Sequence, residues 1–245
     1  MTDQLDYRRD AGPDPRAGDS RPSGPRGQGG PPLGVLAVVF TALFVAGLVL
    51  SVVLAGGATF PSPFGPVADT LAYFRDHQSA VQVSALFQFA AAIPLAIYAA
   101  TATARLHRLG VRAPGAFITL AGGLLAAAFL AGSGLVTWVL SRPEVAGEPA
   151  LVRALQDLAF ATGGPGHVVP LGLLVAGIAV PGMLARLLPR WLTVAGLVIA
   201  ALAELATLTL LVSDAAFLLP IARFTGLAWL VIAGFLLPRT RKERS

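Results

Sequence analysis

The sequence contains no cysteine, which excludes a disulfide framework, a thiolate zinc site and a cysteine nucleophile. Charged residues are scarce as well, at 13% of the 245 residues against roughly 25% in a soluble domain. The sequence also has no Walker A motif, no dinucleotide fingerprint, no His-x-x-x-His pair and no nucleophile elbow. These absences favour a protein that is not an enzyme and that needs no metal or cofactor.

Hydrophobic residues, in contrast, make up 55% of the chain and lie in long blocks. A helix needs about 20 mainly apolar residues to cross a bilayer. Blocks of about this length predict an all-α protein, a polytopic membrane helix bundle whose partner is the lipid bilayer. The six predicted transmembrane helices cover residues 33–55, 79–103, 115–140, 167–187, 191–213 and 220–237.

The segments between these spans predict how the bundle is connected. Six spans taken in order form three consecutive hairpins. Apolar residues at helical spacing predict short interfacial helices in the first two outer loops, over residues 67–78 and 149–162. Between the second and third spans we expect a short basic loop over residues 105–112.

Both ends of the chain are polar. Residues 1–32 are rich in Gly, Pro, Arg and Asp and have too few apolar side chains to form a core, so a disordered cytoplasmic tail is predicted. Residues 33–238 form the predicted six-span domain, and residues 239–245 form a basic cytoplasmic tail.

The Lys and Arg residues predict the orientation of the chain. Of the 18, 14 lie in the two tails and in the loops on the same side, and 4 lie on the opposite side. Because positively charged segments stay in the cytoplasm, we expect a multi-pass protein of the cell membrane with both termini cytoplasmic. The net charge of +5 does not indicate nucleic acid, since the arginines lie at the ends of apolar spans.

Polar side chains inside the spans are the candidate functional residues, because they are costly in a membrane. Glu204 lies inside the fifth span, roughly 20 Å from the inner face at a helical rise of 1.5 Å per residue. Arg223 and His167 lie near the outer ends of their spans, and the second span has Gln82, Ser84 and Gln88 at a similar depth. The candidate polar cluster in the outer half of the membrane consists of Glu204, Arg223, His167, Gln88 and Thr207.

Two interpretations of this cluster compete. In the functional one, an outward-opening pocket uses Glu204 to bind a cation, a proton or a cationic ligand. In the structural one, Glu204 and Arg223 form an ion pair. A lone charge at the bilayer centre costs about 2.5–3.5 kcal/mol, and keeping a Glu protonated at pH 7 costs roughly 3.7 kcal/mol. Because these costs are similar, an arginine within reach favours the ion pair. No metal-ligand spacing is present.

Small residues predict close helix packing in the third span. Gly122 and Ala126 are four residues apart, as are Ala128 and Gly132. This spacing lets helix backbones approach closely, so we expect the third span to be a central helix.

Five segments of the second half of the chain stand out: Gly-Gly-Pro-Gly-His (163–167), Pro-Leu-Gly-Leu-Leu (170–174), Leu-Pro-Arg-Trp-Leu (188–192), Phe-Leu-Leu-Pro-Ile-Ala-Arg-Phe (217–224) and Gly-Leu-Ala-Trp-Leu (226–230). With these segments, the chain from about Leu33 to its end resembles a family of uncharacterised six-span integral membrane proteins of high-GC bacteria, grouped as a domain of unknown function. The resemblance implies six spans and an inner-membrane location. It implies no activity and no catalytic residues.

The sequence leaves the molecular function open between classes. The sparse set of buried polar groups favours a regulatory or structural membrane interaction protein, with a second copy of the chain or another membrane protein as its partner. The alternative is a small transporter with a polar pocket in the outer half of the bilayer. An intramembrane enzyme is the least favoured class, because no nucleophile–base pair or metal site is visible.

Overall fold

The computed structural model describes residues 30–112 and 114–239. The predicted tails over residues 1–32 and 239–245 lie almost entirely outside this part of the chain and stay predictions. The elements in the described residues are all helical: α1 (Leu33–Leu54), α2 (Val67–Asp76), α3 (Gln78–Arg108), α4 (Gly115–Leu140), α5 (Pro143–Ala146), α6 (Pro149–Ala161), a π-helical segment η1 (Thr162–Gly166), α7 (His167–Leu184), α8 (Arg190–Leu205), two 3-10 segments η2 (Ala206–Leu210) and η3 (Ser213–Phe217), and α9 (Leu218–Leu236).

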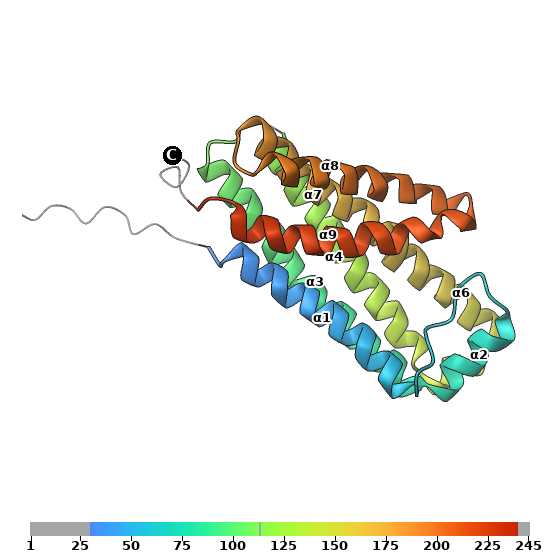
Figure 1. Cartoon of the computed structure of the whole chain (residues 1–245). Helices are drawn as coiled ribbons and strands as arrows, with labels where there is room; N and C mark the ends of the chain where they lie inside the picture. The colour runs from blue at the N-terminus through green and yellow to red at the C-terminus, as the bar shows by residue number, and fades with distance from the viewer. Residues whose placement is uncertain (1–29, 113, 240–245) are drawn as a thin grey trace, which may run out of the picture. The chain divides into compact units, whose positions relative to one another are not determined.

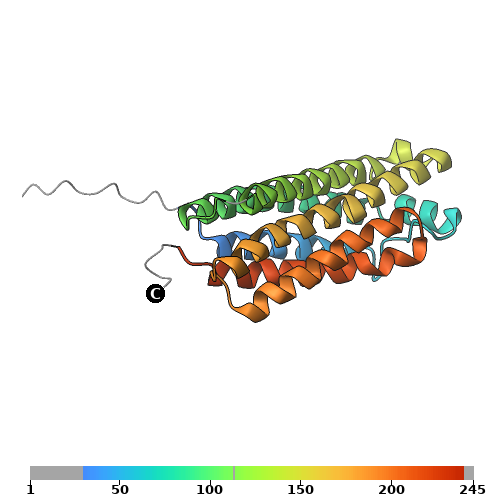
Figure 2. The same cartoon turned by 90° about the horizontal axis from the view of Figure 1, so that it is seen from above.

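Six helices are long and apolar enough to cross a membrane, which confirms the predicted all-α, six-helix bundle. The chain is a multi-pass membrane protein. Its hairpin partners pack against one another: α1 with α3, α4 with α7, and α8 with α9. Figures 1 and 2 show the long helices running side by side along one axis. We call the end with the start of α1 and the end of α9 the terminal end, and the opposite end the distal end.

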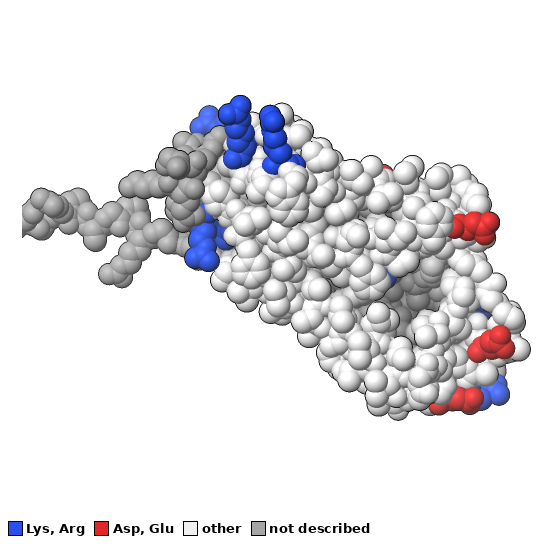
Figure 3. All heavy atoms as spheres, in the orientation of Figure 1, with Lys and Arg blue, Asp and Glu red and all other residues white. Residues whose placement is uncertain are grey.

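The surface of the bundle matches a bilayer environment. Many large apolar side chains point outward, including Val53, Leu86 and Phe117, which are more than half exposed. In water such a surface would promote association, whereas in a bilayer it faces lipid. Figure 3 shows Lys and Arg side chains gathered at the terminal end, acidic side chains at the distal end, and a surface between them that is almost free of charge.

The terminal half of the bundle is tightly closed. The indole Nε1 of Trp229 donates to the carbonyl oxygen of Leu192 at 2.7 Å, and the hydroxyl of Tyr98 donates to that of Leu230 at 3.2 Å. Both side chains are buried in one continuous apolar core. Each polar atom thus finds a backbone acceptor on a neighbouring helix, and the two bonds link α3, α8 and α9.

The central helix of the bundle is α7, not the third span. In the run Pro149–Leu184, 67% of the most apolar window is buried, against 39% for Gly115–Leu140. The two small-residue pairs of α4 also differ. Gly122 packs against the backbone of α7, with an added Cβ only 2.6 Å from Leu174 N, whereas Gly132 meets nothing within 4 Å. The prediction for Ala128 and Gly132 is wrong, because that pair lies on the outer face of α4.

Three predicted boundaries also need correction. The basic loop begins later than residue 105, because α3 continues through Arg108 with Leu106 buried and with basic side chains in its last turn, where the helix dipole favours them. The helix predicted over residues 149–162 is present as α6, but η1 joins it to α7 instead of leaving it as a separate surface helix. The fifth span ends in the 3-10 turns of η2, before residue 213.

Candidate functional site

A cavity of about 370 Å³ lies in the distal half of the bundle. Figure 3 shows the surface hollowed near the distal end, on the side of the bundle. We call this space the distal cavity. Its polar lining comes from α1, the loop after α1, α3, α4, α6 and α9, and consists of Ser51, Ser62, Ser84, Gln88, Ser133, Thr137, Gln156 and Arg223. Its larger apolar lining residues are Phe44, Leu48, Phe60, Leu130, Phe160 and Leu219.

The cavity exists because α1 and α9 pack closely at only one end. At the terminal end two glycines meet, and a Cβ added to Gly234 would lie 2.9 Å from the backbone nitrogen of Gly34. Toward the distal end the pair is separated by rings: those of Phe44 and Phe224 lie 6.3 Å apart, centroid to centroid. Figure 1 shows α1 and α9 diverging in this direction. The space between them is not filled by a helix.

The loop between α1 and α2 covers part of this space. Gly56 and Gly57 have φ values of 63° and 95°, a left-handed conformation that glycine adopts without strain and that ends α1. Two hydrogen bonds then tie the loop to α6: Gln156 Nε2 donates to the Pro61 carbonyl at 3.0 Å, and Arg153 Nη1 donates to the Gly65 carbonyl at 3.2 Å. The loop therefore forms a fixed wall of the cavity.

Arg223 supplies the cationic group of the cavity. Its Nη2 donates to the carbonyl oxygen of Gly163, and its guanidinium carbon lies 5.4 Å from the centre of the Phe44 ring. Gly163 belongs to η1, where the backbone leaves helical geometry at Gly164 (φ −82°, ψ −106°) and Pro165 has no N–H to donate. The chain is therefore kinked at Gly164 and Pro165, beside the cavity, and glycine and proline are common causes of such kinks.

Among the described residues, no Asp or Glu lines the cavity. The ion pairs of this part of the chain, Arg142–Glu144 at 3.8 Å and Arg153–Asp157 at 3.6 Å, do not involve Arg223. In the same residues the Nε of Arg223 is shielded from solvent and has no hydrogen-bond partner, and the same holds for the Oε1 of Gln156. The cavity thus contains a positive charge without a carboxylate to neutralise it.

The structure divides the predicted polar cluster. Gln88 and Arg223 line the distal cavity, and the Nε2 of Gln88 donates to Ser84 Oγ at 3.3 Å. His167 is only 2% exposed and does not line the cavity; its Nδ1 donates to the Ala126 carbonyl at 2.9 Å and so ties α7 to α4. Glu204 and Thr207 are exposed on the outside of α8 and η2.

The predicted ion pair between Glu204 and Arg223 is wrong, since no ion pair joins them in the described chain and Arg223 binds the Gly163 carbonyl instead. The reason is the rotation of α8. The centre of its buried face lies between Ala200 and Ala203, and Glu204 is turned about 70° away from that centre and is exposed. The sequence placed the two residues at a similar depth in the membrane, but depth does not determine which face of its helix a residue occupies.

Several cavity residues were missed by sequence reasoning. Ser133 and Thr137 are four residues apart on α4 and face the cavity together, while Gln156 was assigned to a surface helix. A signal was present, because two hydroxyls at helical spacing inside an apolar span mark one polar face.

The fold and the cavity define the class of this chain as a six-helix, multi-pass membrane protein with a charged cavity in one half of the bundle. In comparisons with protein-family models, curated proteins and solved structures, nothing matches the chain. The resemblance to a six-span bacterial family therefore stays a prediction from the sequence segments.

Proposed function

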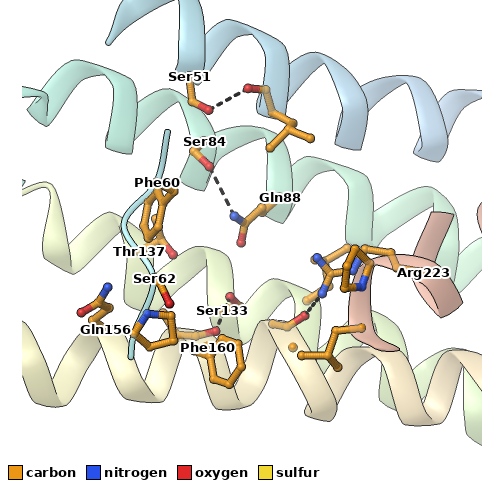
Figure 4. Close-up of a pocket in the computed structure, with 18 of the residues that line it drawn as sticks. Ser51, Phe60, Ser62, Ser84, Gln88, Ser133, Thr137, Gln156, Phe160 and Arg223 are labelled. Carbon is orange, nitrogen blue, oxygen red and sulfur yellow. Dashed lines mark hydrogen bonds between the residues drawn. The ribbon is translucent and has the colours of Figure 1, made fainter. Parts of the chain in front are cut away.

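We propose that the protein is a regulatory membrane protein that binds a small molecule in the distal cavity. The observation that carries this proposal is the cavity itself. Its volume of about 370 Å³ falls in the range of about 300–1,000 Å³ typical of small-molecule sites, and it combines aromatic walls with a few convergent polar groups. Figure 4 shows Gln88, Ser133 and Arg223 arranged around the same space.

The proposed orientation puts the distal cavity on the outer side of the cell membrane and both termini in the cytoplasm. The support is the split of Lys and Arg, 14 to 4, in the sequence. The location in a bacterial inner membrane rests on the resemblance of the sequence segments. A ligand would then reach the cavity from outside or from the outer leaflet.

The closed terminal half favours regulation over transport. A protein that reports whether a ligand is bound needs no path across the membrane, and the hydrogen bonds of Tyr98 and Trp229 join α3, α8 and α9 in the terminal half. Occupancy of the cavity would instead change how a second copy of the chain or another membrane protein is contacted.

A small transporter is the second candidate, and one observation favours it. The helix run Pro149–Leu184 is interrupted at η1, directly beside the cavity. Interrupted helices beside a binding site are a common feature of secondary transporters. A transporter would have to open the terminal half in a second conformation.

The absence of cysteine allows a direct test with single-cysteine variants. Ser84 lines the cavity and Thr103 lies in the closed half, and their exposed fractions are matched at 7% and 6%. We expect Ser84→Cys, but not Thr103→Cys, to react with a small membrane-impermeant thiol reagent added outside. An unreactive Ser84→Cys in folded protein would refute the proposal. Reaction of Thr103→Cys from the cytoplasmic side would favour the transporter.

A further inference from the structure

The donor groups of Arg223 are held in place but only partly used. A guanidinium has five N–H donors in a rigid, planar arrangement. In the described residues, Arg223 donates one hydrogen bond, from Nη2 to the Gly163 carbonyl, and the Phe44 ring covers one face of the group. The side chain is therefore fixed from two sides before any ligand arrives, which lowers the entropy cost of binding.

The positive charge of Arg223 would be stabilised by a bound anion. A charge inside a membrane protein is costly unless it is paired, and no carboxylate lines the cavity in residues 30–112 and 114–239. A bound oxyanion would supply the missing counter-charge and would accept charge-assisted hydrogen bonds from Arg223. This ligand is opposite in charge to the cation or proton expected for a site built on Glu204.

Neutral donors stand near the same space. Ser84 Oγ accepts a hydrogen bond from Gln88 Nε2, so the Ser84 hydroxyl proton is free to be donated. In Figure 4 the side chains of Ser84 and Gln88 approach the cavity from α3, and that of Arg223 approaches it from α9. An anionic group held by an arginine and supported by a hydroxyl is a common arrangement for carboxylates and phosphates.

The rest of the cavity suits a hydrocarbon chain. Phe44, Phe160 and Leu219 form apolar walls beside the charged group. Arg223 is the sixth residue of α9, about 8 Å along the helix axis from its first residue. Figure 3 shows the hollow on the side of the bundle, where a bilayer would lie, not only at its distal tip. A molecule with its head at this depth would have its chain among lipid tails.

We infer that the ligand of the distal cavity is a single-chain amphiphile with one anionic head group, a carboxylate or a phosphate, that binds Arg223 through this head. The inference rests on the proposed function, because it specifies the ligand of the same cavity. The hydrocarbon chain lies against the phenylalanine walls and extends toward the outer leaflet. Arg223 is the residue that selects the head group.

The test uses a Ser51→Cys variant in nanodiscs of phosphatidylcholine, since Ser51 lines the cavity but is not among the proposed head-group donors. The readout is its labelling rate by an impermeant thiol reagent. Dodecanoate is compared with dodecanol, which has the same chain and no charge. We expect dodecanoate to protect the thiol at about tenfold lower concentration than dodecanol does, since a charge-assisted hydrogen bond corresponds to at least one such factor. Dodecyl phosphate should behave as dodecanoate does.

Variants of Arg223 assign this preference to one side chain. In the Ser51→Cys background, Arg223→Gln should abolish the preference for dodecanoate over dodecanol. Arg223→Lys should keep part of this preference, because the positive charge remains. Arg142→Gln is the matched control, since Arg142 is a distal arginine that does not line the cavity. If Arg223→Gln fails to fold, dodecanoate and dodecanol are compared in the protein with Arg223 and in Arg223→Lys. A weaker preference for dodecanoate in Arg223→Lys would still assign the head-group selection to this side chain.

The outcomes separate the inference from the proposed function. Equal protection by dodecanol and dodecanoate would overturn the anionic head group while leaving a ligand-binding cavity in place. A preference that survives in Arg223→Gln would overturn the role of Arg223. A thiol that is unreactive in every nanodisc would sink the proposed function itself. Protection by added phosphatidylglycerol but not by dodecanoate would overturn the single-chain amphiphile, because phosphatidylglycerol has two chains, whereas protection by dodecanoate and not by phosphatidylglycerol would support it.

Discussion

Arg223 illustrates how a helix bundle accommodates a cation without an acid. The guanidinium bonds to the Gly163 carbonyl and stacks on the Phe44 ring, and both are dipolar or polarisable groups that stabilise positive charge. An arginine is better suited to this than a lysine, because its charge is delocalised and weakly hydrated. The pairing leaves donors unused, which is the basis of the inferred anion site.

The separation of Glu204 and Arg223 can be measured with a double-mutant cycle. The two side chains share no partner in the described residues, so the losses of stability in Glu204→Gln and Arg223→Gln should add to within about 0.3–0.5 kcal/mol. Unfolding in one detergent, followed for the two single variants and the double variant, gives the coupling energy. A coupling of about 1 kcal/mol or more would show that the two charges meet after all.

Two glycines of α4 provide a matched pair of substitutions. A Cβ at Gly122 would lie 2.6 Å from the Leu174 nitrogen and 2.8 Å from the Pro170 oxygen, so Gly122→Ala should cost about 1–3 kcal/mol as α4 and α7 are pushed apart. Gly132 has open space, so Gly132→Ala should stabilise the helix, by up to about 1 kcal/mol. Thermal unfolding of both variants in the same detergent checks the signs. Equal effects would place both residues on similar faces.

At the scale of elements, the run from α6 through η1 to α7 positions the cavity. The Ser133 hydroxyl on α4 donates to the Ala159 carbonyl at 3.0 Å, one turn before the π-helical segment. Ser133 also lies directly against Gly163. The interruption in the helix thus coincides with its closest contact to α4 near the cavity, and it brings the Gly163 carbonyl to Arg223.

This contact predicts a rescue experiment. A Cβ on Gly163 would collide with Ser133 Oγ and lie 3.1 Å from Ser133 Cβ, so Gly163→Ala should destabilise by about 1–3 kcal/mol. Replacing the hydroxyl in Ser133→Ala removes the nearest atom, so the double variant Gly163→Ala, Ser133→Ala should recover part of the loss. Unfolding temperatures of the three variants measure this. Strict additivity would mean that η1 can shift away from α4 without cost.

At the scale of the whole molecule, charge decides the orientation in the membrane. The excess of Lys and Arg on the side of the termini predicts that reporter fusions at Gly110 and Ser245 will report cytoplasm. Fusions at Gly65 and Gly147 should report the outside. An outside signal at Ser245 together with a cytoplasmic signal at Gly110 would contradict the four spans between these sites. An inverted pattern at all four sites would move the distal cavity to the cytoplasmic side.

The sequence by itself determined the number of long apolar helices and the presence of further helices after the first and the third of them. A bilayer leaves a chain few alternatives, because every buried backbone group must be bonded within a helix of sufficient length. The span Gly115–Leu140 was predicted with both of its ends, since glycine and proline at one side and Ser141 at the other mark the change in composition. These properties are local and need no knowledge of neighbours.

Only the tertiary structure decided which face of each helix points inward. In a soluble protein the apolar face is the buried face, but lipid and protein interior are equally apolar, so hydrophobicity does not fix the rotation of a membrane helix. For this reason Glu204 is outside while Ala203 is inside, and Gly122 packs while Gly132 does not. The rotations of α3, α4 and α9 bring Gln88, Ser133 and Arg223 to one cavity. The rotation of α7 instead points His167 at α4, where its hydrogen bond to the Ala126 carbonyl joins the two helices.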